Sequence, residues 1–139
     1  MSIVVAYEAA PEAEAALDVG IAEASLRGLP LSIITHVGGA VVEAAGEAKA
    51  MRTVRDAVES ALTAALAKAT AAGVTATTSI VGGTDPAAAI VEHARSNDAT
   101  LIVTGVRRRS AVGKLLMGST SRDVILSAHC PVLAVKSPE

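Results

Sequence analysis

The fold of this chain is decided by residues 100–121, which read TLIVTGVRRRSAVGKLLMGSTS. The first five residues are apolar or β-branched and predict a buried strand over residues 100–104. A helix is predicted to start at Ser119, and Gly105 and Gly118 bound the loop between strand and helix. A buried strand that leads through such a loop into a helix is typical of an α/β protein with a parallel sheet.

The rest of the chain repeats this alternation of strand and helix. Apolar runs rich in Val and Ile predict four more strands, at residues 3–7, 31–37, 74–81 and 131–136. Ala-rich stretches of helical period predict helices over residues 11–27 and 48–72, and helices that begin at Asp85 and at Ser119. Residues 38–47 contain three glycines and are predicted as a loop or a frayed helix start. We therefore expect one α/β domain over residues 1–139, with an open five-stranded parallel sheet and about four helices.

Local signals mark several helix ends. Gly73 stands where a helix C-cap favours a residue that tolerates positive φ. The pair Asp85-Pro86 predicts an N-cap followed by proline at the first helical position. Ser119 is predicted to cap the last helix with its hydroxyl.

Composition argues against several classes of protein. The chain has 12 Lys plus Arg against 14 Asp plus Glu and a single Tyr, so it lacks the basic, aromatic surface of single-stranded nucleic-acid-binding proteins. No apolar run reaches the ~18–20 residues of a membrane span, and the first residues lack the basic start of a secretory signal. We expect a cytoplasmic protein that binds neither nucleic acid nor membranes.

A metal site is also not expected. His36, His93 and His129 fall on different predicted elements without the spacing of metal ligands. The single cysteine, Cys130, is interpreted as a small buried apolar residue rather than a nucleophile.

The loop before the last helix is predicted to bind an anion. Residues 105–122 hold five basic residues and no acidic one, whereas residues 1–48 hold seven acidic residues and one basic one. Gly118 leaves room for a phosphate at a helix start, where free N–H groups and the helix dipole attract anions. Ser119, Thr120 and Ser121 add hydroxyl donors. An alternative fits the residues equally well: turn glycines, a helix cap and a solvated arginine run.

Motifs along the whole chain are shared with a known family. They are VVAYE at residues 4–8, HV at 36–37, GTDP at 83–86 and HCPVLAV at 129–135. Together with the loop from Gly105 to Ser119, these motifs make the sequence similar to the universal stress proteins. The ATP-binding members have a glycine, two residues, a glycine, nine residues, and then glycine and Ser or Thr.

Two positions depart from the family pattern. Gly105, Gly118 and Ser119 keep the spacing of the ATP-binding motif, but Arg108 replaces its second glycine. At the end of the first strand the family usually has Asp-Gly-Ser, where this chain has EAA at residues 8–10. A carboxylate is retained there with one more methylene.

The resemblance implies a strand order of 3-2-1-4-5 and a nucleotide site at the switch point between strands one and four. It places adenine near Val37, the carboxylate of Glu8 near the ribose or base, and phosphates on the loop. The implied ligand is ATP or AMP, with or without Mg²⁺. The residues expected at this site are Ala6, Tyr7, Glu8, Val37, Thr104, Gly105, Arg107, Arg108, Arg109, Gly118, Ser119, Thr120 and Ser121.

Three functions remain open at this stage. The first is a nucleotide-binding stress-response regulator that acts through an unidentified protein partner, and the second is a dimeric interaction protein that binds no nucleotide. The third is a weak ATPase, which the sequence supports least because it shows no paired carboxylates and no nucleophile with a base. A homodimer is expected through residues 131–136, which the resemblance places at a sheet edge.

Overall fold

The computed structural model describes residues 1–8, 10–38, 45–107 and 118–138. Its centre is one parallel sheet with the strand order β3-β2-β1-β4-β5. The strands are β1 (Ser2–Ala6), β2 (Leu31–His36), β3 (Ala76–Val81), β4 (Ala99–Val106) and β5 (Val132–Lys136). Both the predicted fold class and the predicted strand order are confirmed.

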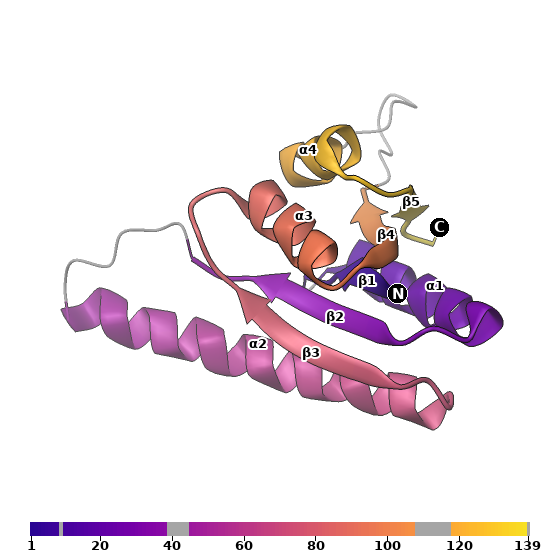
Figure 1. Ribbon diagram of the computed structural model, residues 1–139. Coiled ribbons are helices and arrows are strands. Elements are labelled where there is room, and N and C mark those ends of the chain that lie inside the picture. Colours follow the sequence, from indigo (N-terminus) through magenta and orange to yellow (C-terminus); the bar gives the residue numbers. More distant parts are fainter. Residues whose placement is uncertain (9, 39–44, 108–117, 139) are drawn as a thin grey trace.

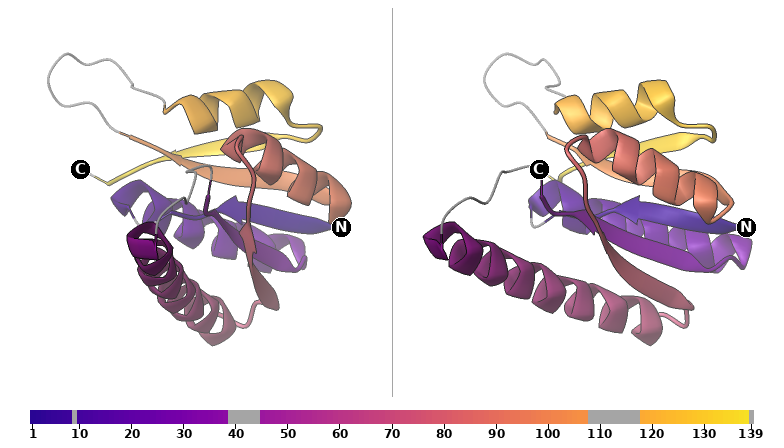
Figure 2. Two further views of the ribbon diagram at one scale, coloured as in Figure 1. Left: turned by 90° about the vertical axis from the view of Figure 1, so that its left-hand side faces the viewer. Right: turned by 60° about the vertical axis from the view of Figure 1, so that its left-hand side comes forward.

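Four helices cover the sheet, two on each face (Figure 2). They are α1 (Pro11–Arg27), α2 (Ala45–Ala71), α3 (Pro86–Ser96) and α4 (Ser119–Ser127). The alternation of side chains along β1 separates the two cores. Ile3 and Val5 pack with α1 and α2, whereas Val4 packs with α3 and with Val124 of α4.

The core is built from aliphatic residues, and close packing takes the place of aromatic bulk. Helix α1 approaches β1 at Gly20, where an added Cβ would overlap Cγ2 of the fully buried Val5. Even a methyl group at this position would push the helix away from the sheet. The glycine therefore sets the distance between α1 and β1.

The helix ends agree with the sequence signals at two positions and differ at two. Gly73 follows α2 with φ of 78°, and the Asp85 carboxylate accepts a 3.1 Å hydrogen bond from the Ala88 N–H, as predicted. The predicted cap of α4 is wrong, because Gly118 occupies the N-cap position, Ser119 is the first helical residue, and no side chain caps the helix. Helix α2 already begins at Ala45, and residues 39–44 of the predicted loop lie outside the described residues.

Strand β4 is longer than predicted, and this changes the place of one glycine. It continues to Val106, and Gly105 pairs with Val135 of β5. Gly105 therefore belongs to the sheet and does not open the loop. Among the described residues, no helix is long and apolar enough to cross a membrane.

Candidate functional site

The carboxyl ends of β1 and β4 open into one pocket. These two strands are neighbours with Ala6 opposite Thr104, and the chain leaves them toward opposite faces of the sheet. The pocket between them has a volume of about 270 Å³. Its lining residues are Ala6, Glu8, Ala10, Glu12, Ala13, Ile90, Thr104, Gly105, Arg107, Gly118, Ser119, Thr120 and Ser121. A crevice at such a switch point is where open α/β sheets bind their ligands.

One wall of the pocket is the N-terminal end of α4. Gly118 has φ of −61° and ψ of 152°, a conformation open to any residue, and no described atom lies within 4 Å of a Cβ built there. Neither its backbone conformation nor packing against the described residues requires glycine at this position. None of the described residues fills the space beside Gly118, which lies at the start of a helix whose first N–H groups carry partial positive charge.

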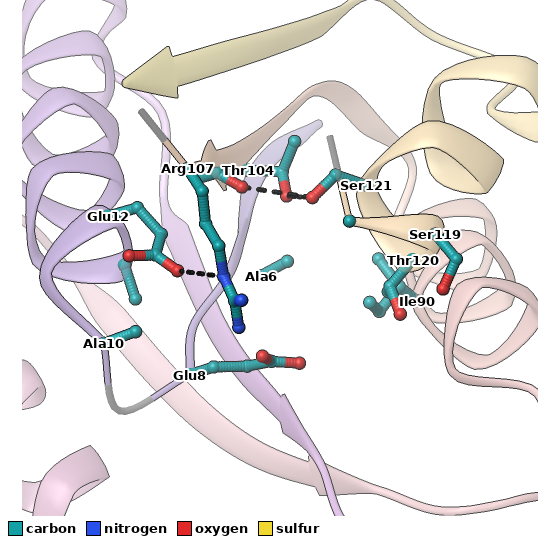
Figure 3. A pocket seen from close by; sticks show the side chains of 13 residues that line it. Ala6, Glu8, Ala10, Glu12, Ile90, Thr104, Arg107, Ser119, Thr120 and Ser121 are labelled. Carbon is teal, nitrogen blue, oxygen red and sulfur yellow. Dashed lines mark hydrogen bonds and ion pairs between the residues drawn. The ribbon is translucent and has the colours of Figure 1, made fainter. Parts of the chain in front are cut away.

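Hydroxyl groups tie the first turn of α4 to the end of β4. Ser121 Oγ donates to the Gly105 carbonyl at 3.1 Å and lies 3.1 Å from Thr104 Oγ1. Thr104 is buried, and these two bonds hold Ser121 in place. Ser119 and Thr120 lie beside it on the same wall (Figure 3).

The opposite wall carries the charges (Figure 3). Glu8 follows β1, Glu12 lies in the first turn of α1, and Arg107 follows β4. Arg107 Nε lies 3.5 Å from Glu12 Oε1. The first turn of α1 also touches β4 directly, because a Cβ on Gly105 would lie 2.5 Å from the Glu12 carbonyl oxygen. The glycine at position 105 is thus explained by packing alone.

The structure brings nine of the thirteen predicted site residues to this pocket. They are Ala6, Glu8, Thr104, Gly105, Arg107, Gly118, Ser119, Thr120 and Ser121. Arg108 and Arg109 lie outside the described residues. Tyr7 and Val37 do not line the pocket.

Tyr7 packs into the core under α1 and α2. Its hydroxyl donates to the Glu14 carboxylate, and its carbonyl accepts a 2.6 Å hydrogen bond from Thr35 Oγ1. Burial, helped by the neighbouring Glu14 carboxylate, raises the pKa of Tyr7 to about 12. The two hydrogen bonds hold the end of β1 against β2 and α1, and the Tyr7 hydroxyl stays protonated.

Val37 lies beyond β2, next to the β3–α3 connection. Its N–H donates to the Val81 carbonyl at 2.9 Å, and the adjacent His36 Nε2 lies 2.8 Å from the Gly83 carbonyl oxygen, to which it can donate. These contacts hold the ends of β2 and β3 together.

The other two histidines lie away from the pocket. His93 Nε2 lies 2.8 Å from Ser32 Oγ beneath α3, and burial lowers the pKa of His93. His129 is exposed. Cys130 is half-buried against the core under α3 and α4, and burial raises the pKa of its thiol. Within the described ranges, no group of three His, Cys, Asp or Glu side chains could hold a metal ion.

Four pocket residues were not predicted from the sequence to lie at the site: Ala10, Glu12, Ala13 and Ile90. Ala13 and Ile90 carry only the signal of apolar, inward-facing helix positions, which core residues share. Glu12 lies at a helix position whose acidic neighbours are solvent-exposed. Nothing local in the sequence distinguishes it from them.

An open parallel sheet covered on both faces, with a pocket at its switch point, defines a Rossmann-like α/β protein. A model of the universal stress protein family matches residues 1–136, and this chain belongs to that family.

Individual relatives agree with this assignment. The chain is 37% identical to a universal stress protein of Mycolicibacterium smegmatis over 136 residues, covering 96% of each chain. It is 46% identical over 54 residues to a universal stress protein of Methanocaldococcus jannaschii, covering 39% of this chain and 32% of that protein. Among solved structures, the universal stress protein of Archaeoglobus fulgidus in complex with dAMP has a TM-score of 0.72 and 28% identity, with 98% of each chain covered.

Proposed function

We propose that this protein binds an adenine nucleotide, ATP or AMP, in the pocket between β1 and β4 and acts as a nucleotide-linked regulator of a stress response. The observation that carries the proposal is the N-terminal end of α4, which has no side-chain cap, lines the pocket, and has none of the described residues packed against Gly118. Phosphate oxygens are suitable acceptors for these N–H groups.

The chemistry of the two walls suits a nucleotide. On the α4 wall, the N–H groups and the hydroxyls of Ser119 and Thr120 would donate to phosphate. On the opposite wall, the exposed carboxylate of Glu8 would accept hydrogen bonds from ribose hydroxyls or the adenine amino group. Adenine near Val37, and phosphate contacts from Arg108 and Arg109, stay expectations of the family resemblance.

The Archaeoglobus fulgidus relative supports the ligand class. That protein was solved with dAMP, which shares adenine with both proposed nucleotides and the single phosphate with AMP. At 28% identity over nearly the whole chain, the relationship makes adenine nucleotides the first ligands to test.

Hydrolysis is the weaker alternative. Hydrolysis needs a base that activates a water molecule. Among the described residues that line the pocket, the side chains that could act as this base are the carboxylates of Glu8 and Glu12. Glu8 is exposed, and Glu12 is paired with Arg107. We therefore propose binding and signalling through a protein partner rather than efficient catalysis.

We also propose a homodimer through β5, which ends the sheet next to β4. Leu133 of this strand is 36% exposed and Ala134 is exposed. Pairing with a second copy would satisfy the free backbone groups of the edge and bury Leu133. Val135 would contribute less to this contact, because it packs against the core of its own chain. The cytoplasmic location stays a prediction.

The direct test is to identify and measure the ligand. Purified protein is denatured and the supernatant analysed by mass spectrometry for AMP, ADP and ATP, and binding of ATP, AMP, adenosine and GTP is then measured by calorimetry with and without Mg²⁺. We expect adenine nucleotides to bind more tightly than adenosine, because the phosphate contributes. No retained nucleotide and no binding of ATP or AMP would favour the interaction protein that binds no nucleotide.

A further inference from the structure

The pocket holds a positive charge that already has a partner. Arg107 is the one Lys or Arg among the described residues that line it, and its Nε lies 3.5 Å from Glu12 Oε1. The Arg107 side chain is 78% exposed, whereas that of Glu12 is 18% exposed. Glu12 therefore sits in a confined place, and the guanidinium remains open to solvent and to a ligand. In Figure 3 its far end points away from Glu12 and toward the Glu8 side.

The position of Glu12 does not depend on the ion pair. Its backbone belongs to the first turn of α1, which touches β4 so closely that Gly105 has no room for a Cβ. A carboxylate in the first turn of a helix is also favoured by the helix dipole. Glu12 would thus stay beside Arg107 when the guanidinium turns to another anion.

The charges that line the pocket connect the Glu12–Arg107 ion pair to the affinity for phosphate ligands. Two carboxylates, Glu8 and Glu12, face the pocket against the single guanidinium of Arg107 among the described lining residues. An ion pair this exposed and this long is weak, so a phosphate that makes charge-assisted hydrogen bonds can displace the carboxylate. Glu12, which keeps its position but loses its ion pair, then repels the phosphate, and the repulsion grows with the charge of the ligand.

We propose that Glu12 is a specificity-determining residue, an internal counter-ion that competes with the ligand's phosphates for Arg107. It lowers the affinity for ATP more than for AMP, and leaves adenosine unaffected. The inference rests on the proposed nucleotide binding and adds to it a preference for the less charged nucleotide.

The test compares three ligands across a double-mutant cycle. Dissociation constants for ATP, AMP and adenosine are measured for wild type, Glu12→Gln, Arg107→Gln and the double variant. The control is Glu23→Gln, which removes the same charge from α1. It also breaks a Glu–Arg pair, because Arg27 Nε lies 3.0 Å from Glu23 Oε2. Neither Glu23 nor Arg27 lines the pocket. Thermal unfolding of each variant reports on the fold.

We expect Glu12→Gln to tighten ATP binding by up to about fivefold, the upper end of what an exposed ion pair contributes. The gain should be smaller for AMP and absent for adenosine. It should also be smaller when Arg107 is already Gln, because the substitution then relieves only the direct repulsion between Glu12 and the phosphates. Arg107→Gln should weaken ATP binding more in the Glu12→Gln background than in wild type. The control should bind like wild type.

Three results would overturn the inference while leaving nucleotide binding intact. They are an unchanged or weaker ATP affinity in Glu12→Gln, an equal change for adenosine, or a gain that survives undiminished without Arg107. If wild type binds none of the three ligands, the proposed function fails and this inference fails with it. If Glu12→Gln does not fold, Glu12→Asp replaces it, because the shorter side chain withdraws the carboxylate and should give a smaller gain of the same sign.

Discussion

Replacing Gly118 by valine should abolish nucleotide binding and leave the protein folded. The backbone at Gly118 has φ of −61° and ψ of 152°, which valine adopts readily, and no described atom lies within 4 Å of the new Cβ. The remaining cost is that valine is a poorer N-cap residue than glycine, by up to about 1 kcal/mol. For a chain of this length that lowers the midpoint of thermal unfolding by roughly 3–5 °C.

The effect on the ligand should be far larger. The valine side chain would fill the space in front of the first N–H groups of α4, so a phosphate could no longer reach them. Hydrogen bonds to a charged group are worth about 1.5–3 kcal/mol each, and the loss of two costs about 3–6 kcal/mol. Since about 1.4 kcal/mol is a factor of ten, the affinity for ATP should fall at least about 100-fold.

This loss of affinity can be measured by calorimetry, with ATP and adenosine titrated into wild type, Gly118→Val and a control variant. The control is Ser127→Val, which places the same side chain at the exposed far end of α4. Adenosine should lose less affinity than ATP in Gly118→Val, because it has no phosphate. An ATP affinity equal to wild type in folded Gly118→Val would refute the placement of phosphate at this helix.

Three further predictions follow from the packing. Burial lowers the pKa of His93, so the folded state resists protonation of this side chain. The free energy of unfolding should therefore fall as the pH drops below about 6.5. Urea titrations at pH 7.5 and pH 5 should show a smaller fall for His93→Gln than for wild type. Gly20→Ala should destabilise the fold by up to about 2 kcal/mol in the same assay, because the overlap with Val5 outweighs the gain of about 1 kcal/mol in helix propensity. Leu133→Lys should shift the mass measured by light scattering toward the 13.9 kDa monomer. The control Val54→Lys changes a half-exposed residue of α2 and should leave the mass unchanged. A monomeric wild type at micromolar concentration would argue against the dimer.

Much of the fold could be predicted from the sequence because the signals are local. The β-branched runs and Ala-rich helical periods predict the elements, most of them to within two residues, and the Asp85 cap is encoded by adjacent residues. The order of the strands in the sheet could not be predicted from such local signals. It came from resemblance to a family, since no periodicity tells which parallel strands become neighbours.

At the site, too, local features could be predicted from the sequence and the directions of some side chains could not. One turn of sequence, from Gly118 to Ser121, carries the features of an anion-binding helix start, and the structure places all four residues at the pocket. Tyr7 stands next to Glu8 in the sequence, but the alternation along an extended backbone sends its side chain into the core.

The sequence by itself determined the alternation of elements, the aliphatic core and the glycine–hydroxyl start of α4, because each of these depends on residues within a turn or a strand of one another. The tertiary structure alone decided that Ile90 joins the pocket and that Glu12 meets Arg107. That meeting requires the first turn of α1 to rest on the end of β4 at Gly105. Contacts between segments so distant along the chain are set by the packing of whole elements, and no window of sequence contains them.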